Sequence, residues 1–385
     1  MHLDSLKLVD TLPTKLVFDA GAGMRLVVEP HAPGVFRIRC GRPEAVAADI
    51  LPGARARVHA EVLLARPEAI GEAIMEPLKG SQKGWRLVQG DVSLDISANP
   101  FKLTLQRLGK TVLALSESGI ARSDELWSLG FDLKRSEKIF GLGETFGDLD
   151  RRGETIISDA PDHRALPLAW SPNGWGVYVN TLGRVEHDLG AESASEYLVA
   201  IEDETLDIFI FAGEPTEILN QYTQLTGRAG QPSLWSMGVW IEQHGSHNAS
   251  QTAELIAEFR RLSLAVDGVL LLPPAAWTYQ DSKLLPEWDA ERFPSPKQLL
   301  NQFGKHATHL CMHTIPAALA ESTIFAELED RGWLLVGESG AAHIFEGVAA
   351  TGGKPFGLID LTHRDAMKTW SERHRHLAEE GVGAT

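Results

Sequence analysis

Apolar residues alternate with polar ones along much of the first 230 residues. Residues 92–96 and 101–105 each carry an apolar side chain at every second position, and Asn99-Pro100 lies between them as a turn. Shorter apolar segments recur at residues 16–18, 35–40, 176–180 and 206–211, separated by Gly, Pro and Asn. This pattern predicts an antiparallel β-sandwich as the N-terminal domain, residues 1–230.

From residue 231 to residue 385, short apolar runs alternate with amphipathic helices. Asn248 with Gln251, and Ser295 with Pro296, mark two helix starts. Strands are expected at residues 269–272 and 310–315, after a first one that follows Trp235. A last helix is expected from Thr362 to Gly381, with Asp365 as its capping residue and an inner stripe formed by Met367, Trp370, His374 and Leu377. The alternation predicts about three to four βα units, the first part of a (β/α)8 TIM barrel.

Composition narrows the classes of partner. The chain has 385 residues, of which 43% are hydrophobic, so each domain can bury a core. Its formal charge of -16 opposes binding to nucleic acid or to an anionic membrane. The first twelve residues have no basic and apolar signal pattern, and Cys40 and Cys311 are the only thiols. We therefore expect a cytoplasmic protein without a disulfide framework, a nucleic-acid partner or a membrane partner.

Several segments, in order, resemble glycoside hydrolase family 31, the α-glucosidase and α-xylosidase family. Residues 137–146 are similar to its "GLGE" segment, and Tyr222 with Thr226-Gly227-Arg228 is similar to its "YT.LTGRP" linker. Residues 235–240 are similar to its first barrel strand, so a strand is expected there. Trp288-Asp289 with Phe293-Pro294 resembles its "WD...FPDP" segment, and residues 358–362 resemble its "VDFT" segment. The resemblance implies a galactose-mutarotase-like sandwich followed by a catalytic TIM barrel.

The resemblance also implies retaining hydrolysis of α-glycosides. That reaction needs two carboxylates about 5 Å apart and no cofactor. In the family the nucleophile is an aspartate at the end of the fourth barrel strand, which by alignment would fall a few residues beyond Thr385. The catalytic residues are therefore unknown, and we expect the chain alone to be truncated and inactive. Residues 273–277 also lack the carboxylate with which the family holds sugar hydroxyls, and His363-Arg364 replaces an Asn-Pro pair.

Five residues are candidates for contacting the substrate. Barrel sites form at the carboxyl ends of strands, and sugars stack on aromatic faces. The aromatic candidates are Trp240, Trp277, Trp288 and Phe345, for each of which core packing is an equal alternative. Glu242, expected just past the first strand, either contacts a sugar hydroxyl or lies in solvent. His244 and His247 lack a third ligand at a suitable spacing, so no metal site is predicted.

Two functional interpretations remain open. The first is a retaining α-glycosidase of which this chain carries the N-terminal portion, with an α-glycoside carbohydrate as its partner. The remaining barrel segment or a second copy of the chain would then cover the open sheet edge. The second is a degenerate, non-catalytic homologue that binds carbohydrate or another partner, which the missing carboxylate at residues 273–277 favours.

Overall fold

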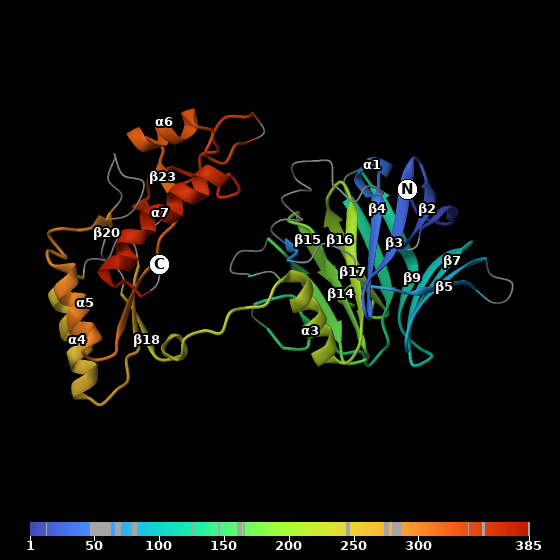
Figure 1. The fold of residues 1–385 in the computed structure, drawn as a ribbon, viewed down its shortest axis with the longest axis horizontal. Coiled ribbons are helices and arrows are strands. Elements are labelled where there is room, and N and C mark those ends of the chain that lie inside the picture. The colour runs from blue at the N-terminus through green and yellow to red at the C-terminus, as the bar shows by residue number, and fades with distance from the viewer. Residues whose placement is uncertain are drawn as a thin grey trace. The chain divides into compact units, whose positions relative to one another are not determined.

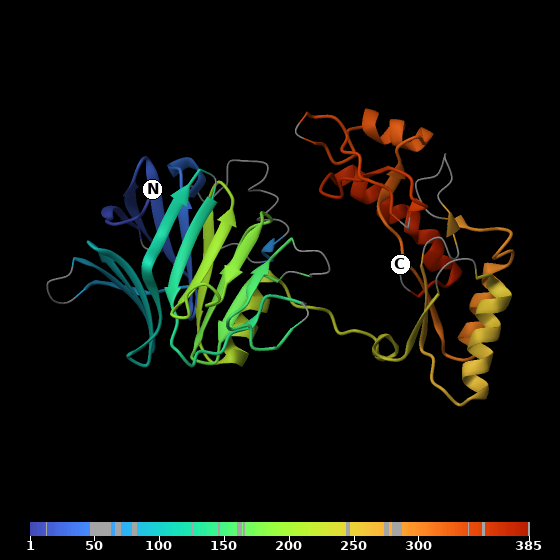
Figure 2. The same cartoon turned by 180° about the vertical axis from the view of Figure 1, so that it is seen from behind.

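The computed structural model of the protein describes residues 1–385 except 13, 47–62, 66–70, 79–82, 125, 145–146, 160–163, 165, 244–246, 273–276, 279–286, 338, 349–350 and 384–385. The chain forms two compact units, Met1–Ala229 and Gly230–Thr385. In Figures 1 and 2 the first unit runs from blue to green and the second from yellow to red. No helix within the described stretches combines the length and the apolar character that crossing a membrane requires.

The first unit is the predicted β-sandwich (Figure 1). Among the described residues, one sheet has eight strands in the order β1-β2-β3-β4-β17-β14-β13-β11, and the other has nine in the order β12-β15-β16-β10-β9-β8-β7-β6-β5. The eight-stranded sheet consists of β1 (Lys7–Leu12), β2 (Lys15–Gly21), β3 (Met24–Ala32), β4 (Val35–Gly41), β11 (Phe140–Gly141), β13 (Leu168–Ser171), β14 (Trp175–Val179) and β17 (Leu206–Ala212). The nine-stranded sheet consists of β5 (Ile74–Pro77), β6 (Gly84–Gln89), β7 (Val92–Ala98), β8 (Phe101–Arg107), β9 (Lys110–Ser123), β10 (Leu126–Asp132), β12 (Thr155–Ile157), β15 (Val185–Asp188) and β16 (Glu196–Glu202).

The alternation of side chains builds the core between the two sheets. Leu94 of β7 and Leu103 of β8 are buried in it, whereas Asp95, the residue that follows Leu94 on β7, is only half-buried. The facing sheet contributes Phe36 of β4 and Ile208 of β17 to the same cluster. Burying one such side chain contributes about 1.5–3 kcal/mol. The period of two that predicts these strands therefore also identifies the residues that join the sheets.

A helix covers the other face of the eight-stranded sheet. Helix α3 (Pro215–Thr226) begins with a capping box between Glu214 and Glu217. Its buried Ile218 and Tyr222 pack in one cluster with Phe209 of β17. The short helix α1 (Pro43–Val46) follows β4. This face of the sheet is consequently buried as well, although the strand pattern alone indicates only one buried face.

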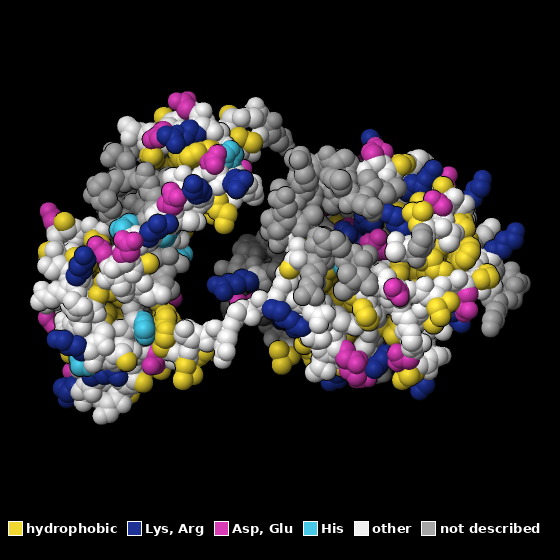
Figure 3. Space-filling view, in the orientation of Figure 1, with side chains coloured by type: hydrophobic (Ala, Val, Ile, Leu, Met, Phe, Trp, Pro, Cys, Tyr) yellow, Lys and Arg dark blue, Asp and Glu magenta, His cyan; other side chains and the backbone are white. Residues whose placement is uncertain are grey.

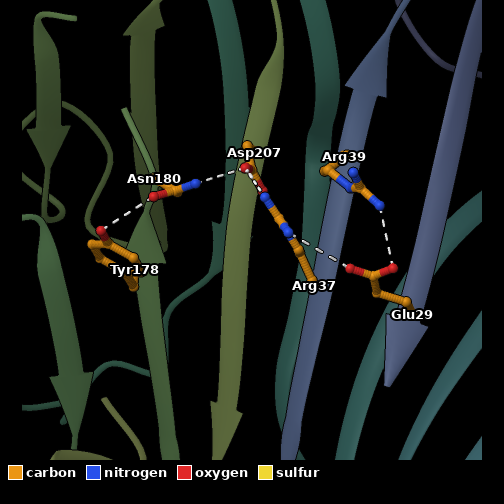
Figure 4. A network of polar contacts seen from close by, with 6 residues as sticks. All are labelled: Glu29, Arg37, Arg39, Tyr178, Asn180 and Asp207. Atoms are coloured by element: carbon orange, nitrogen blue, oxygen red, sulfur yellow. Dashed lines mark hydrogen bonds and ion pairs between the residues drawn. The ribbon is translucent and has the colours of Figure 1, made fainter. Parts of the chain in front are cut away.

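A network of charged residues lies on this second buried face (Figure 4). Arg37 donates to both carboxylate oxygens of Asp207, from Nε at 2.9 Å and from Nη2 at 2.6 Å. Arg39 donates to Glu29 Oε2 at 3.2 Å, and Arg37 Nη1 lies 3.8 Å from Glu29 Oε1. Asn180 Nδ2 donates to Asp207 Oδ2 at 2.7 Å. Two buried cations and two buried anions thus compensate one another across β3, β4 and β17.

A buried glutamate fixes the start of the segment at residues 137–146. Glu137 is 2% exposed, and its Oε1 accepts hydrogen bonds from Ser171 Oγ, Asn173 Nδ2 and Trp175 Nε1 at 2.7, 2.7 and 2.9 Å. The carboxylate therefore connects this segment to the turn between β13 and β14. Its charge tolerates burial because three donors face it.

The second unit combines a parallel sheet with helices on one of its faces. Among the described residues, β18 (Trp240–Gln243), β19 (Gly268–Leu271) and β22 (His309–Met312) form a three-stranded parallel sheet in that order. Two antiparallel pairs accompany it, β20 (Trp277–Thr278) with β21 (Glu287–Trp288) and β23 (Ala317–Leu319) with β24 (Phe356–Leu358). The helices are η1 (Leu234–Met237), α4 (Ala249–Arg261), α5 (Pro296–Gly304), α6 (Thr323–Asp330) and α7 (Arg364–Glu380). A full barrel of this class has eight parallel strands.

The predicted first strand of this unit was placed too early. Residues 235–240 were expected to be extended, but Leu234–Met237 is a 3-10 helix that ends at Gly238, and the strand begins at Trp240. Asp267 Oδ2 accepts a hydrogen bond from the backbone N of Val239 at 2.8 Å, which fixes where the strand starts. The apolar run therefore spans two elements, because run length alone does not separate a helical turn from a strand.

Two details of the last predicted helix were also wrong. Helix α7 begins at Arg364, and its capping residue is His363, whose side chain accepts from the backbone N of Ala366 at 3.4 Å; Asp365 lies in the first turn. Met367 is 55% exposed, and the fully buried Ala366 takes its place in the inner stripe with Leu377. Ala366 and Trp370 are four residues apart and pack in the same cluster, so they share one face of α7, which turns Met367 away from it. The predicted caps at Asn248, Ser295 and Gly381 are confirmed.

Candidate functional site

The candidate site lies where the three parallel strands end. Gln243, Leu271 and Met312 are neighbours in one register row, so the carboxyl ends of β18, β19 and β22 meet at one edge of the sheet. The backbone continues this pairing, since Leu272 N donates to Gln243 O at 3.1 Å and His313 N donates to Leu271 O at 3.0 Å. Active sites of barrel enzymes form at this end of the strands.

The two faces of the sheet have different neighbours. Val269 and Leu310 pack in one cluster with Ile256 of α4 and Phe303 of α5. Because side chains alternate along a strand, the next row, which contains Glu242, Leu270 and Cys311, faces away from these helices. Glu242 is thereby presented on the face that would be the interior of a barrel.

A buried amide connects the end of β18 to α4. Gln243 is 2% exposed, and the atom assigned as its side-chain oxygen lies 2.5 Å from Thr252 Oγ1. The Thr252 hydroxyl also donates to Asn248 O at 2.9 Å, and a hydroxyl has one proton to donate. The separation of 2.5 Å is that of an O–H···O bond and is too short for an N–H···O bond, so Gln243 Oε1 is the acceptor. The two oxygens therefore share the one proton of Thr252, and this contact ties the end of β18 to α4.

Glu242 lies inside a strand rather than after it. The prediction placed it just past the first strand, but it is the third residue of β18 and its side chain is exposed. The difference follows from the later start of β18. Its carboxylate is the acidic group that β18 presents on the face opposite α4.

Trp240 lies at the opposite end of the strand from the one that was predicted. It is the first residue of β18, and its Nε1 donates to Ser236 O at 3.0 Å. The indole also covers Gly268, where a Cβ atom would lie 2.6 Å from the ring. Its ring centroid is 5.5 Å from that of Trp235. These contacts give Trp240 a packing role at the start of the sheet.

Trp288 and Trp277 are paired across a short antiparallel ladder. Trp288 is half-buried, its Nε1 donates to Glu380 Oε2 at 3.0 Å, and its ring centroid is 5.6 Å from that of Phe293. The side chain of Trp277 lies outside the described residues, as do the backbone of residues 273–276 and the residue His244. Trp288 is therefore held between a helix end and the core, with part of its surface open.

Phe345 belongs to a separate small layer. Its backbone pairs with Phe356 of β24 in an isolated bridge, and the two rings stack with centroids 5.5 Å apart. His343 meets the same ring edge-on at 4.5 Å. Phe345 thus contacts different neighbours from Trp240 and Trp288.

Sequence reasoning missed a polar contact near the end of β22. Thr314 Oγ1 lies 3.2 Å from His374 Nε2, and His374 Nδ1 lies 3.0 Å from Trp370 O. A carbonyl oxygen only accepts, so His374 Nδ1 is the donor to Trp370 O, and the Thr314 hydroxyl faces the other ring nitrogen. The apolar stripe of α7 places His374 on the inner face of the helix but does not identify Thr314 as its partner.

Charged groups around the strand ends are distributed rather than clustered. Asp360, two residues after β24, accepts from the backbone N and the Oγ1 of Thr362 at 2.9 and 2.6 Å, so it forms a local turn. On the face shown in Figure 3, Lys and Arg side chains are interspersed with Asp and Glu over both units. Within the described part of the chain, no group of three His, Cys, Asp or Glu side chains could hold a metal ion.

Two family models match the chain in order. Residues 25–188 match the glycosyl hydrolase 31 N-terminal galactose mutarotase-like domain. Residues 229–385 match the glycosyl hydrolases family 31 TIM-barrel domain. Together these matches cover most of both compact units.

Curated relatives are similar over about two thirds of this chain. An alpha-xylosidase from Lactiplantibacillus pentosus is 28% identical over 275 residues, which are 67% of this chain and 34% of that protein. An alpha-xylosidase from Emericella nidulans is 34% identical over 264 residues, 65% of this chain and 33% of that protein. The matched regions thus make up about a third of the length of these relatives.

Solved structures share the fold at low sequence identity. A family 31 dextranase from Flavobacterium johnsoniae, solved with isomaltotriose, has a TM-score of 0.85 and 18% identity over 100% of this chain and 47% of that one. A family 31 α-xylosidase from a soil metagenome, solved with xylose, has a TM-score of 0.77 and 19% identity over 98% of this chain and 56% of that one.

Proposed function

Because the chain belongs to glycosyl hydrolase family 31, we propose that it is part of a retaining α-glycosidase, carrying the sandwich and the first strands of the catalytic barrel. The observation that carries this proposal is the ordered match of residues 25–188 and 229–385 to the two family domains. Relatives named as α-xylosidases and α-glucosidases support an α-glycoside as the substrate.

We further propose that the chain does not hydrolyse glycosides by itself. Retaining hydrolysis needs a nucleophile and an acid about 5 Å apart. On the sheet face opposite α4, the described strands β18, β19 and β22 present one carboxylate, Glu242, beside Leu270 and Cys311. In this proposal Glu242, Trp277, Trp288 and Phe345 contribute to substrate binding, and no cofactor takes part.

Hydrolysis of aryl glycosides tests this proposal. The 385-residue chain is incubated with 4-nitrophenyl α-glucoside and α-xyloside, and release of nitrophenol is followed. We expect no release above that of buffer alone. The variant Glu242→Gln and the matched Glu254→Gln, on the exposed face of α4, would both leave this baseline unchanged. Turnover by the wild type that Glu242→Gln abolishes and Glu254→Gln does not would contradict the proposal.

A second candidate function is carbohydrate binding without catalysis. It is favoured by the exit of β19, where residues 272–277 contain no carboxylate. Sugar binding by the chain, with no turnover after the complementary barrel segment of a relative is added, would favour this candidate. Restored turnover would favour the first.

We also propose a cytoplasmic location. It is supported by Cys40 and Cys311, which are both buried and form no disulfide. Fractionation of cells that express the native gene, followed by immunoblotting, tests this part of the proposal.

A further inference from the structure

The turn between β13 and β14 contains an asparagine–glycine pair that no step of the proposed hydrolysis uses. Ser171 at the end of β13 pairs with Trp175 at the start of β14, and the Gly174 N–H donates to Ser171 O at 3.1 Å. Asn173 is exposed in this turn, whereas Gly174 is buried. In the sequence, Asn173 is the one asparagine that a glycine follows. The turn therefore places together two residues that can react with each other.

The reaction open to this pair is deamidation. Asparagine is a thermolabile residue, and a glycine after it has no side chain to shield its backbone nitrogen. The Gly174 nitrogen attacks Cγ of Asn173, the Cγ–Nδ2 bond breaks, and ammonia leaves with the proton from the Gly174 nitrogen. A five-membered succinimide remains, which water opens at either carbonyl to give aspartate or isoaspartate. In sum, an amide and water become a carboxylic acid and ammonia, and no oxidant or reductant takes part.

Hydrogen bonds in the folded turn restrain both reacting groups. Asn173 Nδ2, the leaving group, donates to Glu137 Oε1 at 2.7 Å. The attacking nitrogen of Gly174 is directed at Ser171 O instead of Asn173, and Asn173 N donates to Ser171 Oγ at 3.2 Å. The reaction consequently requires the turn to open. Its rate follows the fraction of molecules in which the turn is open.

The product does not fit the acceptor that holds the asparagine. Glu137 is 2% exposed, and its Oε1 also accepts from Ser171 Oγ and Trp175 Nε1. Deamidation exchanges the third donor, Asn173 Nδ2, for an oxygen of a second carboxylate. Two anions at hydrogen-bond distance repel each other, and the repulsion is strong because Glu137 is buried. Isoaspartate also adds a carbon atom to the main chain of the turn, so the closed turn cannot re-form around either product.

We infer that Asn173–Gly174 is a restrained deamidation site, at which one uncatalysed hydrolysis releases Glu137 from the turn between β13 and β14. The effect reaches residues 137–146, because Glu137 connects that segment to the turn. Modification at this site is irreversible, so it ends the working life of each molecule that it reaches. The inference rests on contacts within the sandwich and does not depend on the proposed function.

The first experiment measures the rate of deamidation in the native full chain. The protein is kept in mildly alkaline buffer and digested with trypsin, and mass spectrometry follows the peptide of residues 165–184, which contains Asn173. Glu137→Gln removes the charge that holds Nδ2, and we expect deamidation about tenfold faster than in the wild type. The matched control Glu117→Gln, an exposed position of β9, should react as the wild type does. In urea these contacts are lost, so all three chains should react at one rate, faster than the native wild type.

The second experiment measures the effect of the product on stability. Asn173→Asp supplies the aspartate directly, and we expect its thermal midpoint to fall by about 5 °C or more. Asn220→Asp is the matched control, because Asn220 is exposed on α3 and its side-chain oxygen accepts from Arg228, as a carboxylate also would. Its midpoint should change by about 2 °C or less.

Three results would overturn the inference. They are equal Asn173 rates in the native and the unfolded wild type, equal rates in the native wild type and Glu137→Gln, and equal midpoints for Asn173→Asp and Asn220→Asp. Circular dichroism shows whether Glu137→Gln is folded. If it is not, Ser171→Ala replaces it, since this variant removes the hydroxyl that holds Asn173 N, and an unchanged rate there would equally contradict the inference.

Discussion

Asp207 is the central anion of the buried charge network in the sandwich. It accepts two hydrogen bonds from Arg37 and one from Asn180, and its side chain is almost fully buried. Burial alone would raise the pKa of Asp207, but the charge and hydrogen bonds of Arg37, with Arg39 and Asn180, lower it below its ordinary value. A carboxylate whose ionised form is favoured by folding stabilises the fold wherever that form is populated.

Replacing Asp207 should therefore be costly at neutral pH. Asp207→Asn leaves Arg37 buried without its strongest partner, and we expect a loss of about 3–5 kcal/mol in the free energy of unfolding. Asp95→Asn is the matched control, because Asp95 forms a similar two-bond pair with Arg86 at 2.6 Å in a more exposed position. There the loss should be about 1 kcal/mol or less. Urea unfolding measures both, and equal losses would contradict this interpretation.

The Arg37–Asp207 pair also predicts that the free energy of unfolding depends on pH in the acidic range. The pKa of Asp207 is lower in the folded protein than the value of ~3.9 in unfolded chains, so its contribution is complete above that value. The contribution declines as pH falls below ~3.9 toward the folded value. Urea midpoints measured from about pH 7 downward should converge for the wild type and Asp207→Asn in this acidic range. A constant difference would show that the carboxylate charge is not the cause.

Single residues are also where sequence reasoning had least to work with. The apolar runs identify Trp240 and Trp288 as aromatic residues near strands, but the end of the strand at which each lies depends on where the strand starts. Trp240 proved to cover Gly268 at the beginning of β18. The pairing of Asp207 with Arg37 could not be identified, because the two residues lie 170 positions apart in the chain.

At the scale of elements, the corner between β11 and β13 shows why its glycines are needed. Gly141 and Gly143 have φ values of 103° and 89°, which side-chain-bearing residues rarely adopt. A Cβ atom on Gly143 would lie 2.0 Å from Arg164 O, a backbone atom that cannot move aside cheaply. The resemblance of residues 137–146 to a family segment therefore has a cause in backbone packing.

Two alanine substitutions separate conformational strain from the clash. Gly153 has a similar φ of 84°, but a Cβ atom added there would meet no described atom within 4 Å. We expect Gly153→Ala to cost about 1–2 kcal/mol, the strain alone, and Gly143→Ala to cost clearly more. Urea unfolding gives the two losses, and hydrogen exchange at Leu142 and Leu168 shows whether the corner opens locally. Equal losses would mean that the backbone moves aside without cost.

Elements were the scale at which the sequence was most informative. A period of two identified β7 and β8, and the capping box at Asn248 located the start of α4. Both signals are local, so they need no knowledge of the tertiary fold. The predicted element boundaries were wrong where two elements share one apolar run, as at η1 and β18, and where a histidine caps a helix, as at α7.

At the scale of the whole molecule, the chain between the two units carries no regular structure. Residues 227–233 lie in neither a helix nor a strand, and residues 228–234 are exposed. Arg228 bonds to Thr223 Oγ1 and to Asn220 of α3, so the side-chain contacts of the helix extend to this residue. The change in apolar period near residue 230 predicts the two units. The buried ion pairs inside the sandwich could not be predicted from composition.

Limited digestion with trypsin should cut first after Arg228. The product would end at Arg228, as mass spectrometry of the fragment can show, because cleavage requires locally extended and accessible backbone. Arg228→Gln should remove this product. Arg37, within β4, is the internal comparison and should resist cleavage while the sandwich is folded. Early cleavage at Arg37, or none at Arg228, would contradict the assignment of the connector.

The buried charge network limits which substitutions this sandwich can accept in evolution. Altering Glu29, Arg37, Arg39 or Asp207 alone leaves an uncompensated ion in the interior, whereas exchanging all four for well-packed apolar side chains is often tolerated. Related chains should therefore keep the quartet whole or lose it whole. Related chains that keep only part of the quartet would be rare, so these four positions should change together in evolution.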